Sequence, residues 1–280
     1  MKKVKSNPVF MTVVYVVCAL LTVLSIMPFL IMIINATRST VEIQQHAISV
    51  IPSTHLLDNF QILTGKSFNP MRGFINSMIV STGATICTVY FSSLTAYALV
   101  VYNWKLRQSF FTFIMAVMMI PTQVVTIGFY QFMYKIHMTN NFLALILPAI
   151  AAPTTVFFMR QFMLSALPLE VVDSARIDGS REFYTFNHIV LPIMKPAIAT
   201  QAIFSFVSSW NNLFLPLILL TRQEKYTMPI MVSLLKGDIY KTEYGAIYMG
   251  LTLTVLPLFV VYFLLSKYII AGVALGSVKG

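Results

Sequence analysis

The first long uncharged stretch of the chain is residues 6–37, SNPVFMTVVYVVCALLTVLSIMPFLIMIINAT. A membrane-spanning helix needs roughly 20 apolar residues that rise about 1.5 Å each, and this stretch is long enough. Five more stretches of at least 23 residues contain no Lys, Arg, Asp or Glu, namely 73–104, 108–134, 136–159, 196–221 and 244–266. One charge at the centre of a spanning helix costs roughly 2.5–3.5 kcal/mol. The sequence therefore predicts an all-α membrane protein with six transmembrane helices.

The composition excludes several other classes of protein. Of the 280 residues, 58% are apolar and 10% are charged, against roughly 25% charged residues in an average soluble domain. So few charges cannot coat a soluble globule, and so apolar a chain does not stay disordered. Cys18 and Cys87 lie inside apolar runs, and two cysteines cannot build a disulfide framework or a zinc site. The net charge of +10 is spread over the loops, without the dense cluster that a nucleic acid backbone requires.

The loop charges predict an orientation with the N-terminus in the cytoplasm. In this orientation the inward segments carry eleven Lys and Arg residues and the outward segments carry eight, which fits the excess of positive charge on the cytoplasmic side. Six spans return the C-terminus to the cytoplasm. A cleavable signal peptide is the alternative for the first stretch, because three lysines precede it. Its apolar part, Val9 to Ile34, is much longer than the roughly 7–15 residues of a signal peptide, so we expect a retained span.

The chain divides into three expected parts. Residues 1–70 contain the first span and an external loop, residues 71–270 form the core with five spans, and residues 271–280 are a cytoplasmic tail. The segment 160–195 is the longest inward loop and holds four of the nine acidic residues. The segment 222–243 is a second charged outward loop. We expect a partner outside the cell to meet the outward loops and a cytosolic partner to meet the inward one.

Residues 167–196 predict a short helix that ends in a sharp turn at the cytoplasmic face. Pro168 and Glu170 suit the first turn of a helix, where a missing N–H costs nothing and a negative charge complements the helix dipole. Gly179 suits the C-terminal cap, because a positive φ is cheap for glycine. Charges of both signs surround this turn, as on a docking surface for a cytosolic protein. An ordinary interfacial hairpin is the alternative.

A second short helix is expected after the turn. Ser180 can cap its N-terminus. Its apolar residues fall at helical spacing on one face and are Phe183, Phe186 and Val190. Pro192 and Pro196 are expected to end it before the fifth span.

This segment resembles the cytoplasmic loop of the permeases of binding-protein-dependent ABC importers. The family pattern is Glu-Ala-Ala, three residues, Gly, nine residues, Ile, one residue and Leu-Pro. The chain keeps every spacing, with Asp for Glu and Ser for the first Ala, in Asp173, Ser174, Ala175, Gly179, Ile189, Leu191 and Pro192. The resemblance implies a type I ABC importer permease fold, in which the loop 167–192 forms a coupling helix in a groove of an ATPase subunit. It also implies that Asp173 pairs with a basic residue of that groove.

Two further segments resemble carbohydrate permeases of the maltose type, and specifically the smaller of the two permease subunits. They are residues 209–217, SWNNLFLPL, and the tail 276–280, GSVKG, which follows Gly272. The resemblance implies half of the translocation path of an ATP-driven sugar importer in a bacterial inner membrane, with oligosaccharide as the substrate class. The implied partners are a second permease subunit, two ATPase subunits that hold ATP and Mg²⁺, and an extracytoplasmic sugar-binding protein. The chain itself is then no enzyme and holds no cofactor or metal.

Polar residues inside the expected spans are candidates for the substrate path. Trp210, Asn211 and Asn212 lie near the middle of the stretch 196–221. Amide groups beside an aromatic ring suit the hydroxyls and ring faces of a sugar, and polar groups at this depth usually face the bundle interior or a water-filled path. The alternative is that the two asparagines bond neighbouring helices. Gln123 is a further candidate, and its alternative is to satisfy the carbonyl that Pro121 frees.

Other functions fit the sequence less well. The same architecture importing a polyol or a glycerol phosphate ester is the first alternative. A stand-alone secondary carrier usually carries charged groups inside the membrane, and none lies in the six stretches. A membrane enzyme requires a catalytic cluster, which the scattered histidines do not form. Gly65-Lys66-Ser67 matches the end of a P-loop, but position 60, where the pattern requires glycine, is Phe60.

Overall fold

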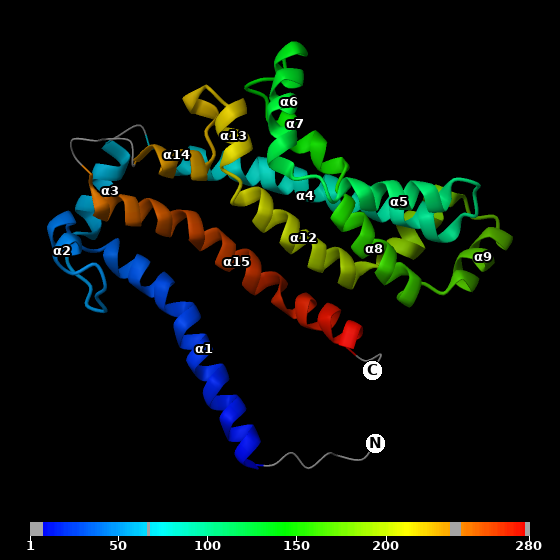
Figure 1. The fold of residues 1–280 in the computed structure, drawn as a ribbon, viewed down its shortest axis with the longest axis horizontal. Helices are drawn as coiled ribbons and strands as arrows, with labels where there is room; N and C mark the ends of the chain where they lie inside the picture. The colour runs from blue at the N-terminus through cyan, green and yellow to red at the C-terminus, as the bar shows by residue number, and fades with distance from the viewer. Residues whose placement is uncertain (1–7, 66–67, 236–241, 278–280) are drawn as a thin grey trace. The chain divides into compact units, whose positions relative to one another are not determined.

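The computed structural model describes residues 8–65, 68–235 and 242–277, except the side chains of residues 8, 122–123 and 264–277. This part of the chain consists of helices joined by turns and loops and contains no strand (Figure 1). The longer helices are α1 (Pro8–Asn35), α3 (Leu56–Gly65), α4 (Pro70–Val101), α5 (Arg107–Val117), α6 (Thr122–Lys135), α8 (Pro153–Ala166), α9 (Leu169–Ile177), α12 (Lys195–Trp210) and α15 (Tyr244–Ser277). The short elements are α2 (Thr40–Gln45), α7 (Leu143–Ile146), η1 (Leu147–Ile150), α10 (Glu182–Thr185), η2 (Phe186–Val190), α11 (Leu191–Ile193), α13 (Phe214–Leu219), η3 (Gln223–Lys225) and α14 (Met228–Leu234).

Four segments of the described chain are long and apolar enough to cross a membrane. They are Val9–Asn35, Pro70–Val101, Leu143–Ala166 and Tyr244–Phe263. A fifth candidate is the pair Glu182–Ile193 and Lys195–Trp210, which passes the same test together but is bent by 82°. By length and composition the described residues thus supply four or five spans, and the total of six stays a prediction.

The stretch 108–134 does not form the single helix that the absence of charge suggests. It is divided between α5 and α6, and neither helix reaches 18 residues. Pro121 lies at the break, with an extended ψ of 124°. A proline has no N–H to donate to the preceding turn and disfavours helical backbone before it, which explains the division.

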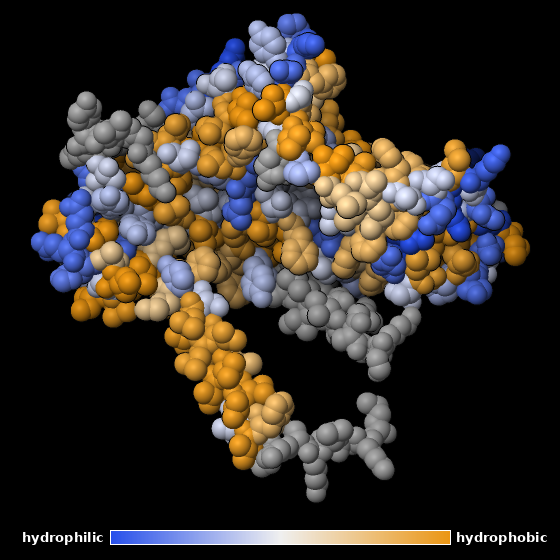
Figure 2. All heavy atoms as spheres, in the orientation of Figure 1, coloured by the Kyte–Doolittle hydropathy of each residue, from blue (hydrophilic) through white to orange (hydrophobic). Residues whose placement is uncertain are grey.

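The contacts divide the chain into two compact units, and the first comprises Met1–Pro70 with Val232–Val255. Within this unit α1 is an apolar helix whose best 18-residue window has no buried residue, and Figure 2 shows its surface as almost entirely hydrophobic. A helix that is apolar on all sides is stable in lipid or against another apolar surface. This supports the prediction of a first span.

The segment after α1 folds upon itself through buried polar groups. Arg38 is 6% exposed, and its guanidinium donates to the carbonyls of His46 and Glu42 at 2.7 and 3.0 Å. Asn59 of α3 donates from Nδ2 to the carbonyls of Ala36 and Arg38, each at 2.9 Å. These bonds hold together the segment that the sequence predicts as an external loop.

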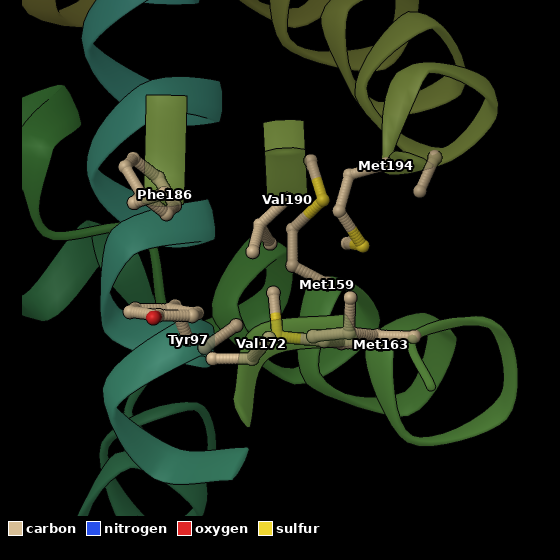
Figure 3. Close-up of a cluster of buried hydrophobic side chains, with 10 residues drawn as sticks. Tyr97, Met159, Met163, Val172, Phe186, Val190 and Met194 are labelled. Carbon is tan, nitrogen blue, oxygen red and sulfur yellow. The ribbon is translucent and has the colours of Figure 1, made fainter. Parts of the chain in front are cut away.

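The second unit comprises Met71–Met231 with Leu256–Gly280 and contains the candidate sites. A buried cluster in this unit joins α4, α8, α9, η2 and α12 (Figure 3). The members are Ala96, Tyr97, Met159, Met163, Leu167, Val172, Phe186, Val190, Met194 and Ala197. This cluster holds the segment 167–193 against α4 and α8.

Candidate functional site: a helical hairpin and a broken helix

Helix α9 ends in a turn that depends on Gly179, as the sequence predicts. Gly179 has a φ of +80°, and its N–H donates to the carbonyl of Arg176 at 3.0 Å. The next N–H, of Ser180, donates to the carbonyl of Ala175 at 2.9 Å. These two bonds form a Schellman motif, which satisfies carbonyls at the helix end and requires a left-handed residue at the glycine position. We call residues 167–193 the hairpin.

The second half of the hairpin differs from the prediction in its cap and in its buried face. Arg181 is the residue before α10, and Ser180 instead places its hydroxyl 2.8 Å from that of Thr185. Phe186 and Val190 are buried, but Phe183 is 68% exposed. Helix α10 has only four residues before the π-helix η2 begins, so the 3.6-residue period does not extend from position 183 to 190.

The two prolines do not end the helix as predicted. Pro192 lies in the first turn of α11 and Pro196 in the first turn of α12. Both positions suit proline, because the N–H groups of a first helical turn have no intrahelical partner. The direction of the chain instead changes by 82° at Met194, the residue that separates the two helices.

The residues of the family pattern occupy both surfaces of the hairpin. Asp173 and Ser174 are exposed, and the Asp173 carboxylate lies 3.2 Å from Nη1 of Arg176. Ala175 is buried, and Leu191 is half-buried against the cluster of Figure 3. Ile189 is half-buried as well, while Pro192 is exposed.

The outer surface of the hairpin combines apolar and charged side chains. Ile177 is 86% exposed at the end of α9, and Phe183 and Tyr184 are 68% and 55% exposed in α10. Figure 2 shows hydrophilic and hydrophobic side chains gathered together at the end of the second unit that carries α9. Large exposed apolar residues beside charges are typical of a surface that another protein covers.

Glu182 ties the hairpin to α4, which the sequence did not reveal. Its Oε2 accepts hydrogen bonds from the hydroxyls of Tyr97 and Tyr102 at 2.9 and 2.6 Å, and its Oε1 accepts from Nε of Arg176 at 2.7 Å. Spacing could not identify this cluster, because Tyr97 is 85 residues from Glu182 along the chain. We call these four residues the Glu182 cluster.

The surroundings of the Glu182 cluster favour an ionised Arg176 and a protonated Tyr102. The hydrogen bond to Glu182 raises the pKa of Arg176 above its usual value. Burial, followed by the hydrogen bond to Glu182, raises the pKa of Tyr102, so its hydroxyl keeps the proton that it donates. The Arg176 guanidinium also lies 5.4 Å from the centre of the Tyr102 ring, within the range of a cation–π contact. A carboxylate with three donors is strongly held, because hydrogen bonds to ionised groups exceed neutral ones in strength.

The second candidate site is a break between α12 and α13 in the stretch 196–221. Trp210 is the last residue of α12 and is 1% exposed. Its ring stacks on Phe206 at 5.6 Å and meets the edge of Phe74 at 5.9 Å, so in this conformation it lies in a buried aromatic group. Asn211 and Asn212 follow it in the non-helical break, and both are exposed.

The two asparagines differ in their bonds. Oδ1 of Asn212 accepts a long 3.4 Å hydrogen bond from the N–H of Leu215, whereas the side chain of Asn211 has no hydrogen bond to the described residues. Gln123 lies in the first turn of α6, and its side chain is outside the described residues. No cluster of three or more His, Cys, Asp or Glu side chains that could hold a metal ion occurs among the residues described.

Comparisons with known proteins identify the family. Residues 88–274 match the model of the binding-protein-dependent transport system inner membrane component. The arabinooligosaccharides transport system permease protein AraQ of Halalkalibacterium halodurans is 35% identical, over 99% of this chain and 100% of that protein. The sn-glycerol-3-phosphate transport system permease protein UgpE of Escherichia coli is 29% identical, over 88% of this chain and 89% of that protein.

A solved structure has the same fold. It is a bacterial ABC transporter involved in the import of the acidic polysaccharide alginate, and one of its chains aligns with a TM-score of 0.80 at 19% identity. The alignment covers 95% of this chain and 98% of that chain. The chain therefore belongs to the family of binding-protein-dependent transport system inner membrane components, the permeases of ABC importers.

Proposed function

We propose that this chain forms half of the translocation path of an ATP-driven oligosaccharide importer and that the hairpin 167–193 couples it to a cytosolic ATPase subunit. The observation that carries the coupling role is the outer surface of the hairpin. Ile177 and Phe183 are among its most exposed apolar residues, beside the exposed carboxylate of Asp173. This mixture suits insertion into a groove with an apolar floor and a basic side chain.

The hairpin would transmit the state of the ATPases to the spans. ATP binding to two ATPase subunits closes them, and the bound Mg²⁺ and ATP belong to those subunits. By linkage, ATP must bind better to the outward-facing state of the permease pair than to the inward-facing one. In the outward-facing state, an extracytoplasmic binding protein releases its sugar into the path between this chain and a second, homologous permease subunit.

The substrate class is supported by the relatives and by the break after α12. AraQ of Halalkalibacterium halodurans is named for arabinooligosaccharides. Asn211 and Asn212 present neutral amides that can both donate to and accept from sugar hydroxyls. A break in a spanning helix is a typical substrate site of transporters, because it frees backbone groups and helix ends.

A glycerol phosphate ester is the second candidate, since UgpE of Escherichia coli is named for sn-glycerol-3-phosphate. A phosphate ester favours a cationic partner in the path. The stretch 196–221 contains no Lys or Arg around the two asparagines. We therefore favour a neutral oligosaccharide.

The coupling role is tested by recovery of the tagged chain in mild detergent. We expect a second permease and an ATPase to co-purify, identified by mass spectrometry, with ATP hydrolysis in the eluate. Asp173→Lys should abolish recovery of the ATPase, while the matched control Glu224→Lys in the outward segment η3 should retain it. Recovery of this chain alone, with transport when it is reconstituted alone, would favour a secondary carrier instead.

The substrate class is tested by uptake into proteoliposomes that hold the recovered assembly and its binding protein. A panel of neutral oligosaccharides, polyols and glycerol phosphate esters is compared. Competition by neutral oligosaccharides is the expected result. Competition by glycerol phosphate esters alone would assign the substrate to the second class.

A further inference from the structure

We propose that Glu182 is a positioning residue that fastens the hairpin to α4, so that movement of the hairpin is passed to α4 through Tyr97 and Tyr102. The proposal rests on the proposed coupling role of the hairpin. The proposal goes beyond that role by naming α4 as the helix that receives the movement. It also names the contact that passes the movement on, which is the Glu182 cluster together with Phe186 and Val172 packed beside it. We call this contact the joint.

One carboxylate connects three parts of the fold. Glu182 begins α10, Tyr97 belongs to α4, Tyr102 lies in the turn after α4, and Arg176 is in the last turn of α9. The two tyrosine hydroxyls share Oε2, and the guanidinium occupies Oε1. Since α9 and α4 thus meet on the same group, neither can shift without breaking a charge-assisted bond.

Apolar packing beside the carboxylate makes the same connection. Phe186 is 1% exposed, and its ring centre lies 5.4 Å from that of Tyr97. Val172 of α9 is also 1% exposed and belongs to the same cluster, which Figure 3 shows between α4 and the hairpin. The joint therefore has a polar part at Glu182 and a close-packed part next to it, and packed interiors transmit displacement rather than absorb it.

The connection of the hairpin to α12 is different in kind. Between Glu182 and α12 the chain passes through the π-helix η2 and then bends by 82° at Met194. A π-helical turn and a sharp bend interrupt the regular ladder of a helix and are common hinge positions. The hairpin is thus connected to the spans in two ways, by side-chain contacts to α4 and by the peptide chain that continues into α12. We infer that the connection to α4 is the stiffer of the two.

The test is the amount of sugar transported per ATP hydrolysed by the full transporter in proteoliposomes. The double variant Tyr97→Phe/Tyr102→Phe removes both hydroxyl donors and keeps the buried ring of Tyr97 and the half-buried ring of Tyr102. We expect it to assemble and hydrolyse ATP, with the transport ratio lowered by about fivefold or more. The matched control is Thr95→Val, which removes a hydroxyl of the same helix whose 2.8 Å bond to the carbonyl of Phe91 stays within α4. It should keep the wild-type ratio.

The single variants measure whether the donors act together. If both hydroxyls hold one carboxylate, the effects of Tyr97→Phe and Tyr102→Phe should be non-additive in a double-mutant cycle. Glu182→Gln, which keeps the shape but removes the charge, should lower the ratio as well. A wild-type ratio in the double variant, or an equal loss in the Thr95→Val control, would overturn the proposal.

A distance measurement keeps the proposal testable if a variant does not assemble. Spin labels are placed at Val171 on the hairpin and at Leu106 after α4, which are 39% and 62% exposed, with Cys18 and Cys87 replaced by Ser. In the otherwise wild-type transporter we expect this distance to stay constant on ATP binding, because the two segments move together. If ATP-driven uptake persists and the distance nevertheless changes, the proposed joint between the hairpin and α4 is wrong. Absence of any ATP-driven uptake would instead refute the proposed function.

Discussion

Replacement of Gly179 tests the coupling role of the hairpin most directly, because the structure shows which backbone conformation this residue must adopt. Gly179 has a φ of +80°, and a Cβ added there would meet no atom within 4 Å. The cost of a side chain is therefore conformational and not steric. A non-glycine residue in the left-handed region costs roughly 1–2 kcal/mol, and asparagine tolerates it best.

These magnitudes predict a graded series. Gly179→Asn should cost least, Gly179→Ala about 1 kcal/mol, and Gly179→Val more, because a β-branched residue at positive φ is a genuine outlier. A change of about 1.4 kcal/mol alters the ratio of two conformations tenfold. The valine variant should thus populate the opened turn at least about tenfold more than the wild type does, while the membrane segments, which do not depend on this turn, still insert.

The assay is sugar uptake per ATP hydrolysed, together with recovery of the assembly from membranes. We expect coupling to fall in the order Gly, Asn, Ala, Val, with normal amounts of inserted protein. Gly128→Ala is the matched control, because Gly128 lies within α6, likewise meets no atom within 4 Å and has no positive φ. In a helix interior the same substitution should stabilise by roughly 0.5–1 kcal/mol. Normal sugar uptake by Gly179→Val would refute the reasoning.

Two further predictions concern the path and the first unit. Asn211→Leu should impair uptake without changing thermal stability, whereas Asn212→Leu should lower both, since of the two only the Asn212 side chain accepts a hydrogen bond from α13, at the N–H of Leu215; unchanged uptake in both variants would remove the asparagines from the path. Gly245→Ala should lower the midpoint of thermal unfolding, because its Cβ would approach Oδ1 of Asn59 to 2.3 Å and the carbonyl of Arg38 to 2.5 Å. An unaltered midpoint would mean that the loop around Arg38 adjusts without loss.

Local rules explain what the sequence predicted correctly. A charge-free apolar run predicts a spanning helix wherever it is long enough, and α1 and α4 follow this rule. The Schellman turn at Gly179 likewise depends on a few neighbouring residues. Each of these features is decided within one helix or one turn, so residue spacing is sufficient to predict it.

Other predictions from the sequence were incomplete. The length of the uncharged stretch predicts one helix, but the chain breaks at Pro121 and forms the two helices α5 and α6. Helical spacing placed Phe183 on the buried face, although the π-helix η2 breaks that spacing. A place for Trp210 in the substrate path stays a prediction, and in this structure its ring packs against Phe206 and Phe74.

Residue types and their spacing were enough to predict the class of the protein, its main apolar spans and the turn of its hairpin, because hydropathy, charge and glycine chemistry act over short distances. The partners that fasten the hairpin could be found only in the folded chain. Glu182 meets Tyr97 and Tyr102 across 85 and 80 residues of chain, and no local pattern encodes which distant hydroxyls a carboxylate will find. That choice follows from how α4, α8 and α9 pack around their common apolar cluster.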